Sequence, residues 1–186
     1  MGFGHHRIDG YVNVDAQAAC HPDQVVDLEQ TPWPWPTGCA TEVRFIHSLE
    51  HMGQAPKTFL SMMSELYRIV QDGGTVTIHA PHPRHDAFLS DPTHVRAITP
   101  ETLRLFDRDL NDRWREDGTP NTPLAHYLGV DFALTNRTVI LSEPYARRFR
   151  QGDLSPEAAD LLVATQNNIA HEYQMTLRVR KPAQVS

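Results

Sequence analysis

Histidines and acidic residues recur at short spacing in two parts of the sequence. The first part is HSLEH at residues 47–51, which matches H-x-x-E-H, the pattern of zinc proteases whose two histidines lie one helical turn apart. Such a site needs a helix around both histidines. Residues 42–46 resemble a strand, however, and Gly53 and Pro56 follow within one turn. We therefore expect the histidines to straddle a strand-to-helix junction, so the pattern does not indicate a protease.

A second group of histidines follows in residues 79–94. It consists of His79, His82, His85 and His94, with Asp86 and Asp91 among them. Imidazoles and carboxylates together can bind zinc or other divalent ions. Spacing alone does not impose a metal geometry on an irregular segment, and polar loop histidines near an active site are the simpler interpretation. We assign no metal ligand from the sequence and keep metal binding by this loop as an alternative.

The overall composition restricts the class of protein. The chain has 186 residues, which suits one domain over residues 1–186. Its net charge of −6 argues against a nucleic-acid partner, because phosphate binding favours a basic surface. No apolar stretch approaches a membrane span, and Cys20 and Cys39 fit neither a disulfide framework nor a zinc ribbon. We therefore expect a cytoplasmic protein without a membrane partner, and its oligomeric state stays open.

Strands and helices must position these residues, and hydrophobic patterns predict where they lie. Strands are predicted at 11–15, 24–29, 42–46, 75–80, 130–135, 138–143 and 173–180, and helices at about 55–70, 99–109 and 156–167. Gly73 and Gly74 are expected to end the first helix, and Asn136–Arg137 to join two strands. The order predicts an α/β fold with a mostly parallel sheet flanked by helices and an antiparallel strand pair toward the C-terminus. Residues 82–125 are expected to form a lid or substrate loop.

Polar residues close several of the predicted strands. Asp15, Asp27 and His47 each stand at or near the carboxyl end of one strand, and Gly2 and Gly4 precede the first. Ligands of open α/β sheets bind beyond these ends, so we expect the three polar side chains to converge on one edge. A carboxylate can accept both hydrogens of a ribose diol, so the arrangement suits a nucleotide-type cofactor.

Six segments occur in an order that is familiar from one family. They are GFGHH, YVNVD, VDLEQTPWPWP, EVRFIHSLEHM, SELYRIVQDGGTVTIHAPHP and SDPTHVRAITPETLRLF. In this order they resemble a class I S-adenosylmethionine-dependent methyltransferase of the broad type 11 kind, over most of residues 1–108. The resemblance implies a Rossmann-like methyltransferase fold, S-adenosyl-L-methionine as the cofactor and methyl transfer as the activity.

The resemblance also implies roles for residues at the cofactor. Gly2 and Gly4 would form the first cofactor loop, close to the methionine end of the cofactor. Asp15 would bind the ribose hydroxyls. Asp27 and Leu28 would lie at the adenine.

Further residues would lie near the transferred methyl group. His47 and Ser48 would follow the fourth strand of the family and face the methionine moiety. An oxygen acceptor would gain from a general base, and histidine suits that role near neutral pH. We expect His51 or His94 to be this catalytic base, with His47 as a further candidate and Asp91 as an orienting partner.

The sequence departs from the family at its start. There the first strand precedes the glycine loop, whereas only Met1 precedes Gly2 here. We expect either that the chain starts too late or that it is a degenerate member. The predicted function is methyl transfer to a small-molecule acceptor, with sugars or polysaccharide precursors as the suggested class. The alternatives are a non-catalytic binding protein that kept the fold and a metal-dependent enzyme that uses the histidine-rich loop.

Overall fold

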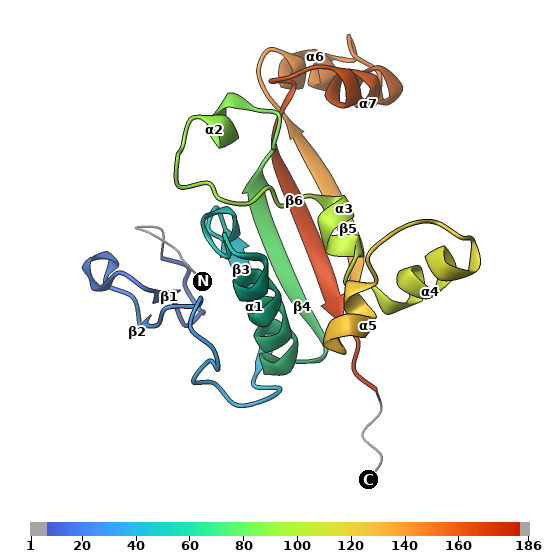
Figure 1. Cartoon of the computed structure of the whole chain (residues 1–186). Helices are drawn as coiled ribbons and strands as arrows, with labels where there is room; N and C mark the ends of the chain where they lie inside the picture. The colour runs from blue at the N-terminus through green and yellow to red at the C-terminus, as the bar shows by residue number, and fades with distance from the viewer. Residues whose placement is uncertain (1–6, 183–186) are drawn as a thin grey trace.

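The structure is a computed structural model that describes residues 7–182 (Figure 1). Its main sheet has the strand order β3-β4-β6-β5, formed by β3 (Ala40–Ile46), β4 (Val70–Pro81), β6 (Ala170–Val179) and β5 (Phe132–Leu141). β3 and β4 are parallel, and β6 is antiparallel to both β4 and β5. Three strands therefore run the same way and β6 runs against them. The predicted mostly parallel sheet with flanking helices is confirmed.

A second, small sheet lies beside β3. It is formed by the parallel strands β1 (Val14–Asp15) and β2 (Gln24–Val25), both shorter than predicted. The Tyr11 hydroxyl donates a hydrogen bond to Glu42 on β3, which ties the two sheets together. Within the described residues, no strand pairs with the outer edge of β3.

The longest helix, α1 (Pro56–Ile69), covers the parallel part of the main sheet (Figure 1). Its buried residues recur at helical spacing and are Phe59, Met62, Met63, Leu66 and Ile69. The helix predicted over about 55–70 is confirmed, but the glycines do not stop it, because it ends at Ile69 and Val70 already pairs with Ala40. Gly74 instead lies in an irregular part of β4, where a Cβ would come within 2.9 Å of the Thr41 carbonyl oxygen.

The remaining helices are short. They are η1 (Ala18–Cys20), η2 (Leu49–His51), α2 (Asp86–Leu89), α3 (Pro100–Arg104), α4 (Arg108–Glu116), α5 (Leu124–Leu128), α6 (Tyr145–Gln151) and α7 (Pro156–Thr165). Thr99 and Ser155 cap α3 and α7, as predicted. The single helix expected over 99–109 is wrong. The Asp107 side chain accepts from Leu110 N at 3.1 Å, so it starts a new helix there.

The two strands predicted at 130–135 and 138–143 form one strand, β5. Asn136 and Arg137 do not turn but pair with Thr176 and Met175 on β6. The register shifts between Leu134 and Asn136, which absorbs one extra residue as a bulge. The polar stretch resembles a turn in sequence, but here it lies exposed on an edge strand, where polar side chains cost little. The antiparallel pair at the C-terminal end is therefore β5 with β6.

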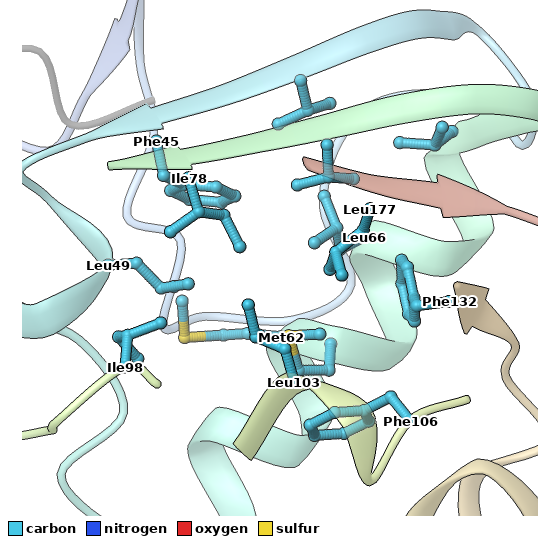
Figure 2. Close-up of a cluster of buried hydrophobic side chains, with 14 of the residues drawn as sticks. Phe45, Leu49, Met62, Leu66, Ile78, Ile98, Leu103, Phe106, Phe132 and Leu177 are labelled. Atoms are coloured by element: carbon cyan, nitrogen blue, oxygen red, sulfur yellow. The ribbon is translucent and has the colours of Figure 1, made fainter. Parts of the chain in front are cut away.

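The hydrophobic core lies between the main sheet and the helices α1 and α3 (Figure 2). Phe45, Ile78 and Leu177 point from the sheet toward side chains of the two helices. Val14, Leu28 and Trp33, beside the small sheet, belong to the same buried cluster. No helix in the described part of the chain is long and apolar enough to cross a membrane.

Candidate functional site

The nearly buried carboxylate of Glu172, on β6, lies at the carboxyl ends of β3 and β4 and contacts side chains from both. Because β6 is antiparallel to β4, its first residues lie beside the last residues of β4, with Glu172 opposite Pro81. His47 follows β3 with a φ of 49°, and its Nε2 lies 2.6 Å from Glu172 Oε2. The Glu172 side chain is 10% exposed and the His47 ring 51% exposed. The strand register therefore brings a solvent-facing imidazole onto a nearly buried carboxylate.

Glu172 has further polar neighbours. Gln174 Nε2 donates to Glu172 Oε1 at 2.6 Å, and His79 Nδ1 lies 3.8 Å from the same oxygen. Burial lowers the pKa of His79, while the Glu172 carboxylate acts in the opposite direction. With its Nε2–H donated to Glu172, the His47 ring carries its lone pair on Nδ1. This is the geometry of a general base held by a carboxylate.

A second cluster lies on η2, which directly follows β3. Val95 N and Arg96 N donate to the Glu50 carbonyl oxygen at 2.9 and 3.1 Å, and they bring the loop around His94 against η2. The His51 and His94 rings then lie 4.6 Å apart between centroids. One potential ligand atom from each of Glu50, His51 and His94 lies within 4.8 Å of the other two. We call these three residues the Glu50 triad.

Glu50 is the most buried member of this triad. It is 1% exposed, and neither carboxylate oxygen accepts a hydrogen bond of normal geometry within residues 7–182. The His47 ring is a close polar neighbour, with its Nδ1 3.8 Å from Glu50 Oε1, beyond hydrogen-bond distance. Burial raises the pKa of Glu50, and its own backbone N–H and the neighbouring histidines oppose that effect.

Hydrogen bonds orient both histidines of the Glu50 triad. His94 Nδ1 lies 2.9 Å from the Phe88 carbonyl oxygen, and the Phe88 ring stacks on the imidazole. His51 Nδ1 lies 2.9 Å from Thr93 Oγ1, which donates its own hydrogen to Asp91 Oδ1 at 2.6 Å. Asp91 thus acts on His51 through Thr93, whereas its Oδ2 is 3.9 Å from His94 Nε2, beyond hydrogen-bond distance.

The residues expected at the cofactor occupy different environments. Asp15 ends β1 and is partly exposed, and its Oδ1 accepts from Gln17 N at 2.8 Å. Asp27 is exposed just beyond β2, and its Oδ1 accepts from Glu29 N at 3.0 Å. Leu28 and Ser48 are each 3% exposed, so their side chains lie in the interior. Gly2 and Gly4 lie outside the described residues.

The histidine-rich segment does not assemble into the four-histidine group considered from the sequence. His82 is 2% exposed and packs on Tyr173, with ring centroids 4.7 Å apart. His85 Nδ1 accepts from Ala87 N at 2.9 Å, which caps α2. Of the four, only His94 belongs to a cluster of potential metal ligands among the described residues. The four histidines therefore do not form one cluster of metal ligands within the described residues.

Glu172, Gln174 and Thr93 were missed from the sequence. Gln174 lies on the polar face of the alternating segment 173–180, and the same alternation extended back by two residues reaches Glu172. That signal marks a polar face but does not say which strand lies opposite. Only the pairing of β6 with β4 brings this face to His47.

An open cavity of about 990 Å³ lies apart from these clusters. It is bordered by the second half of β5, by α6 and α7, and by His85 and His171. None of the residues predicted for the site lines it. The cavity is large enough for a small molecule, but the His47 and Glu50 clusters lie outside its lining.

Comparison with known proteins identifies the fold. No family model and no curated protein sequence matches the chain. The structure is similar to that of a SAM-dependent methyltransferase from Archaeoglobus fulgidus, with 18% identity, 89% of this chain and 74% of that chain covered, and a TM-score of 0.53. The class I methyltransferase fold expected from the resemblance is thereby confirmed.

Two other solved structures match more weakly. A putative methyltransferase from Bacillus halodurans is 17% identical, with 86% of this chain and 71% of that chain covered and a TM-score of 0.41. A 16S rRNA adenine methyltransferase from Catenulisporales acidiphilia is 14% identical, with 89% and 65% covered and a TM-score of 0.41. The predicted exclusion of a nucleic-acid partner stays a prediction, because a shared fold does not identify the partner.

Proposed function

We propose that this protein transfers a methyl group from S-adenosylmethionine to a small-molecule acceptor. The observation that supports this is the fold, which is shared over 89% of the chain with a SAM-dependent methyltransferase. One fold can host many activities, so the fold alone does not identify the methyl acceptor. The sequence resemblance suggests a sugar or polysaccharide precursor. Residues 82–125, which follow the carboxyl end of β4, are our candidate for the segment that covers the acceptor.

The residues at the first two strand ends fit the cofactor chemically. Asp15 presents a partly exposed carboxylate at the carboxyl end of β1, where it can accept the hydrogens of a ribose diol. Asp27 is exposed at the neighbouring strand, where the adenine end would lie. When bound, the cofactor supplies a methyl group on a sulfonium, which is already a reactive donor. The protein then has mainly to position the acceptor and remove its proton.

His47 is the base that the geometry favours. Its Nε2 is held by Glu172 at 2.6 Å, so Nδ1 can accept a proton from an acceptor hydroxyl. Glu172 would stabilise the imidazolium that results. His51 and His94, with Asp91, remain the alternative base, although their Nδ1 atoms are engaged by Thr93 and the Phe88 carbonyl. Replacing His47 with Gln should lower turnover by about 10²–10⁴-fold, the usual contribution of a general base.

Calorimetric titration with S-adenosylmethionine and S-adenosylhomocysteine tests the proposed cofactor. Asp15→Ala should weaken binding by about 1–3 kcal/mol, the scale of losing charge-assisted hydrogen bonds. Asp160→Ala, on α7, is the matched control and should leave the affinity unchanged. Failure of the wild-type chain to bind either compound would contradict the proposal. Binding without turnover on any acceptor would favour the non-catalytic alternative.

A further inference from the structure

The Glu50 triad combines two imidazoles and a carboxylate in one small volume. Its ligand atoms lie within 4.8 Å of one another. Ligands bound to zinc at about 2.0–2.2 Å lie roughly 3.4 Å apart in a tetrahedral site, so side-chain rotation has to draw the three atoms together. We propose that Glu50, His51 and His94 bind a divalent transition-metal ion of the zinc type. This site goes beyond the proposed methyl transfer and does not depend on it.

The first argument is the carboxylate of Glu50. It is 1% exposed, and within residues 7–182 no Lys or Arg pairs with it and neither oxygen accepts a normal hydrogen bond. A buried charge is costly unless it is paired or coordinates a metal. Protonation would remove the charge but would not supply a partner, because among the described residues no acceptor lies within hydrogen-bond distance of either oxygen and the lone pair of His47 Nδ1 is 3.8 Å from Oε1. A bound divalent cation satisfies both the charge and the oxygen lone pairs.

The second argument is the orientation of the two imidazoles. Thr93 Oγ1 gives its hydrogen to Asp91, so it must accept from His51 Nδ1–H. The Phe88 carbonyl can only accept, so it takes a hydrogen from His94 Nδ1. In both neutral rings the proton is therefore on Nδ1 and the lone pair on Nε2. Histidines that bind metals are typically held in this way, with the other ring nitrogen donating to a carbonyl or to a carboxylate-linked group.

The third argument is that backbone hydrogen bonds fix the loop that carries His94 to the turn that carries Glu50. Val95 N and Arg96 N donate to the Glu50 carbonyl oxygen, and Thr93 N donates to Asp91 Oδ1 at 2.8 Å. The loop that carries His94 is thus fixed to the turn that carries Glu50 before any ligand binds. Because the backbone is fixed, only side-chain torsions have to change when the ligand atoms come together, which limits the conformational freedom lost on binding.

The donor set selects the kind of metal. Nitrogen and carboxylate donors suit zinc and related transition metals, whereas Mg²⁺ and Ca²⁺ prefer six or more oxygen ligands. Three protein ligands leave a fourth position for water or a substrate atom. His51 is exposed, so that position is accessible from solvent. Of the residues in HSLEH, only Glu50 and His51 would bind this metal, whereas both histidines of the protease pattern bind zinc. His47 instead contacts the Glu172 carboxylate.

Metal titration of the full chain tests this site. After dialysis against a chelator, the protein should bind one equivalent of Zn²⁺ in competition with a chromophoric chelator, and no Mg²⁺. Co²⁺ should bind with the visible d–d absorption bands of a four-coordinate cobalt ion. Binding of less than one equivalent of Zn²⁺ by the wild-type chain would overturn the proposal.

Variants distinguish this site from zinc bound elsewhere on a histidine-rich surface. Glu50→Gln keeps the shape of the side chain, and His51→Ala removes an exposed ring, so circular dichroism should show both folded. Each should weaken Zn²⁺ binding by at least about 100-fold, and Thr93→Val by about 10–100-fold, as for residues that orient ligands. His126→Ala removes a surface histidine that is paired with Asp112, and it should bind Zn²⁺ like the wild type. Unchanged affinity in the Glu50 and His51 variants would overturn the assignment.

Discussion

The His82 ring packs against Tyr173 at the end of β4, and the residue is only 2% exposed. Its Nδ1 accepts from Arg84 N at 3.2 Å, an interaction that needs the neutral ring. Burial lowers the pKa of His82, and the nearby Arg84 and His85 lower it further. His47, by contrast, has a half-exposed side chain and a carboxylate partner. The same residue type thus packs in the interior at one position, while at the other it faces solvent, where we propose that it transfers a proton.

We expect the stability of the protein to fall when His82 is forced to titrate. The unfolded chain takes up a proton on this ring near pH 6.5, whereas the folded protein does so only at lower pH. The contribution of His82 is therefore complete above pH 6.5 and is lost as the pH falls below it. Urea denaturation at pH 7.5 and 5.5 should show a smaller loss in His82→Phe than in the wild type.

Two details sharpen this comparison. Burial also lowers the pKa of His79, so some pH dependence should persist in the His82→Phe variant. His21→Asn serves as the control, because His21 is exposed with a φ of 53°, a conformation that Asn tolerates. Equal pH dependence in wild type and His82→Phe would show that the ring titrates normally.

At the scale of elements, Arg180 connects the end of β6 to the start of α4 and of β5. Its guanidinium donates to both carboxylate oxygens of Asp131, at 3.1 and 2.7 Å. It also donates to Asp107 Oδ1 at 2.8 Å and to Asp109 Oδ2 at 2.6 Å. Asp107 in turn caps α4. One fork-shaped cation thus fixes where the broken helix restarts.

Arg180→Ala should lower the free energy of unfolding by about 1.5–3 kcal/mol, the scale of hydrogen bonds between charged groups. The control is Arg150→Ala, which breaks an exposed pair with Glu143 and should cost less than about 1 kcal/mol. Arg180→Lys should fall between the two, because an ammonium cannot reproduce the two-pronged contact with Asp131. Urea denaturation measures all three, and equal losses in the Arg180→Ala and Arg150→Ala variants would contradict the role of this contact.

At the scale of the whole molecule, one core joins the two sheets and the helices. Leu66 on α1 is 1% exposed and lies in one buried cluster with Phe132 on β5 (Figure 2). Trp33, beside the small sheet, belongs to the same cluster. A cavity at this position should therefore disturb packing toward both edges of the main sheet, from the small sheet beside β3 to β5. Interiors are packed too densely to close such a gap completely.

Leu66→Ala should lower the free energy of unfolding by about 2–5 kcal/mol. Leu161→Ala, at a 64% exposed position, should change it by less than about 0.5 kcal/mol. Tryptophan fluorescence, which includes the buried Trp33, and far-ultraviolet circular dichroism should give the same midpoint in each variant. Separate midpoints would mean that the small sheet and the main sheet unfold independently.

Local patterns in the sequence were sufficient for the elements that are determined by local interactions. The spacing of Phe59, Met62 and Leu66 predicted α1, and the hydroxyls of Thr99 and Ser155 predicted the starts of α3 and α7. Such signals lie within a few residues of one another, so they survive without knowledge of the fold. The strand-to-helix junction predicted in HSLEH is also confirmed, because β3 ends at Ile46 and η2 begins at Leu49. The two histidines accordingly have different partners: His47 contacts Glu172, whereas His51 contacts Thr93.

Only the tertiary structure decided which distant groups meet. The polar stretch at Asn136 looked like a turn, but β6 offers it a continuous partner and it forms strand instead. Asp107 looked like the interior of a helix until its own capping bond and Arg180 fixed a break there. In both cases a pairing with a distant segment outweighed a weak local preference.

The candidate site likewise has features that the sequence predicts and contacts that only the tertiary structure shows. The sequence by itself determined that acids and histidines follow β1 and β3, because strand ends can be predicted from short apolar runs. It did not determine that Glu172 meets His47, or that His94 meets Glu50. These contacts depend on the register of β6 against β4 and on the loop that hydrogen-bonds to η2. Register and loop packing are set by burial across the whole core, which no short stretch of sequence encodes.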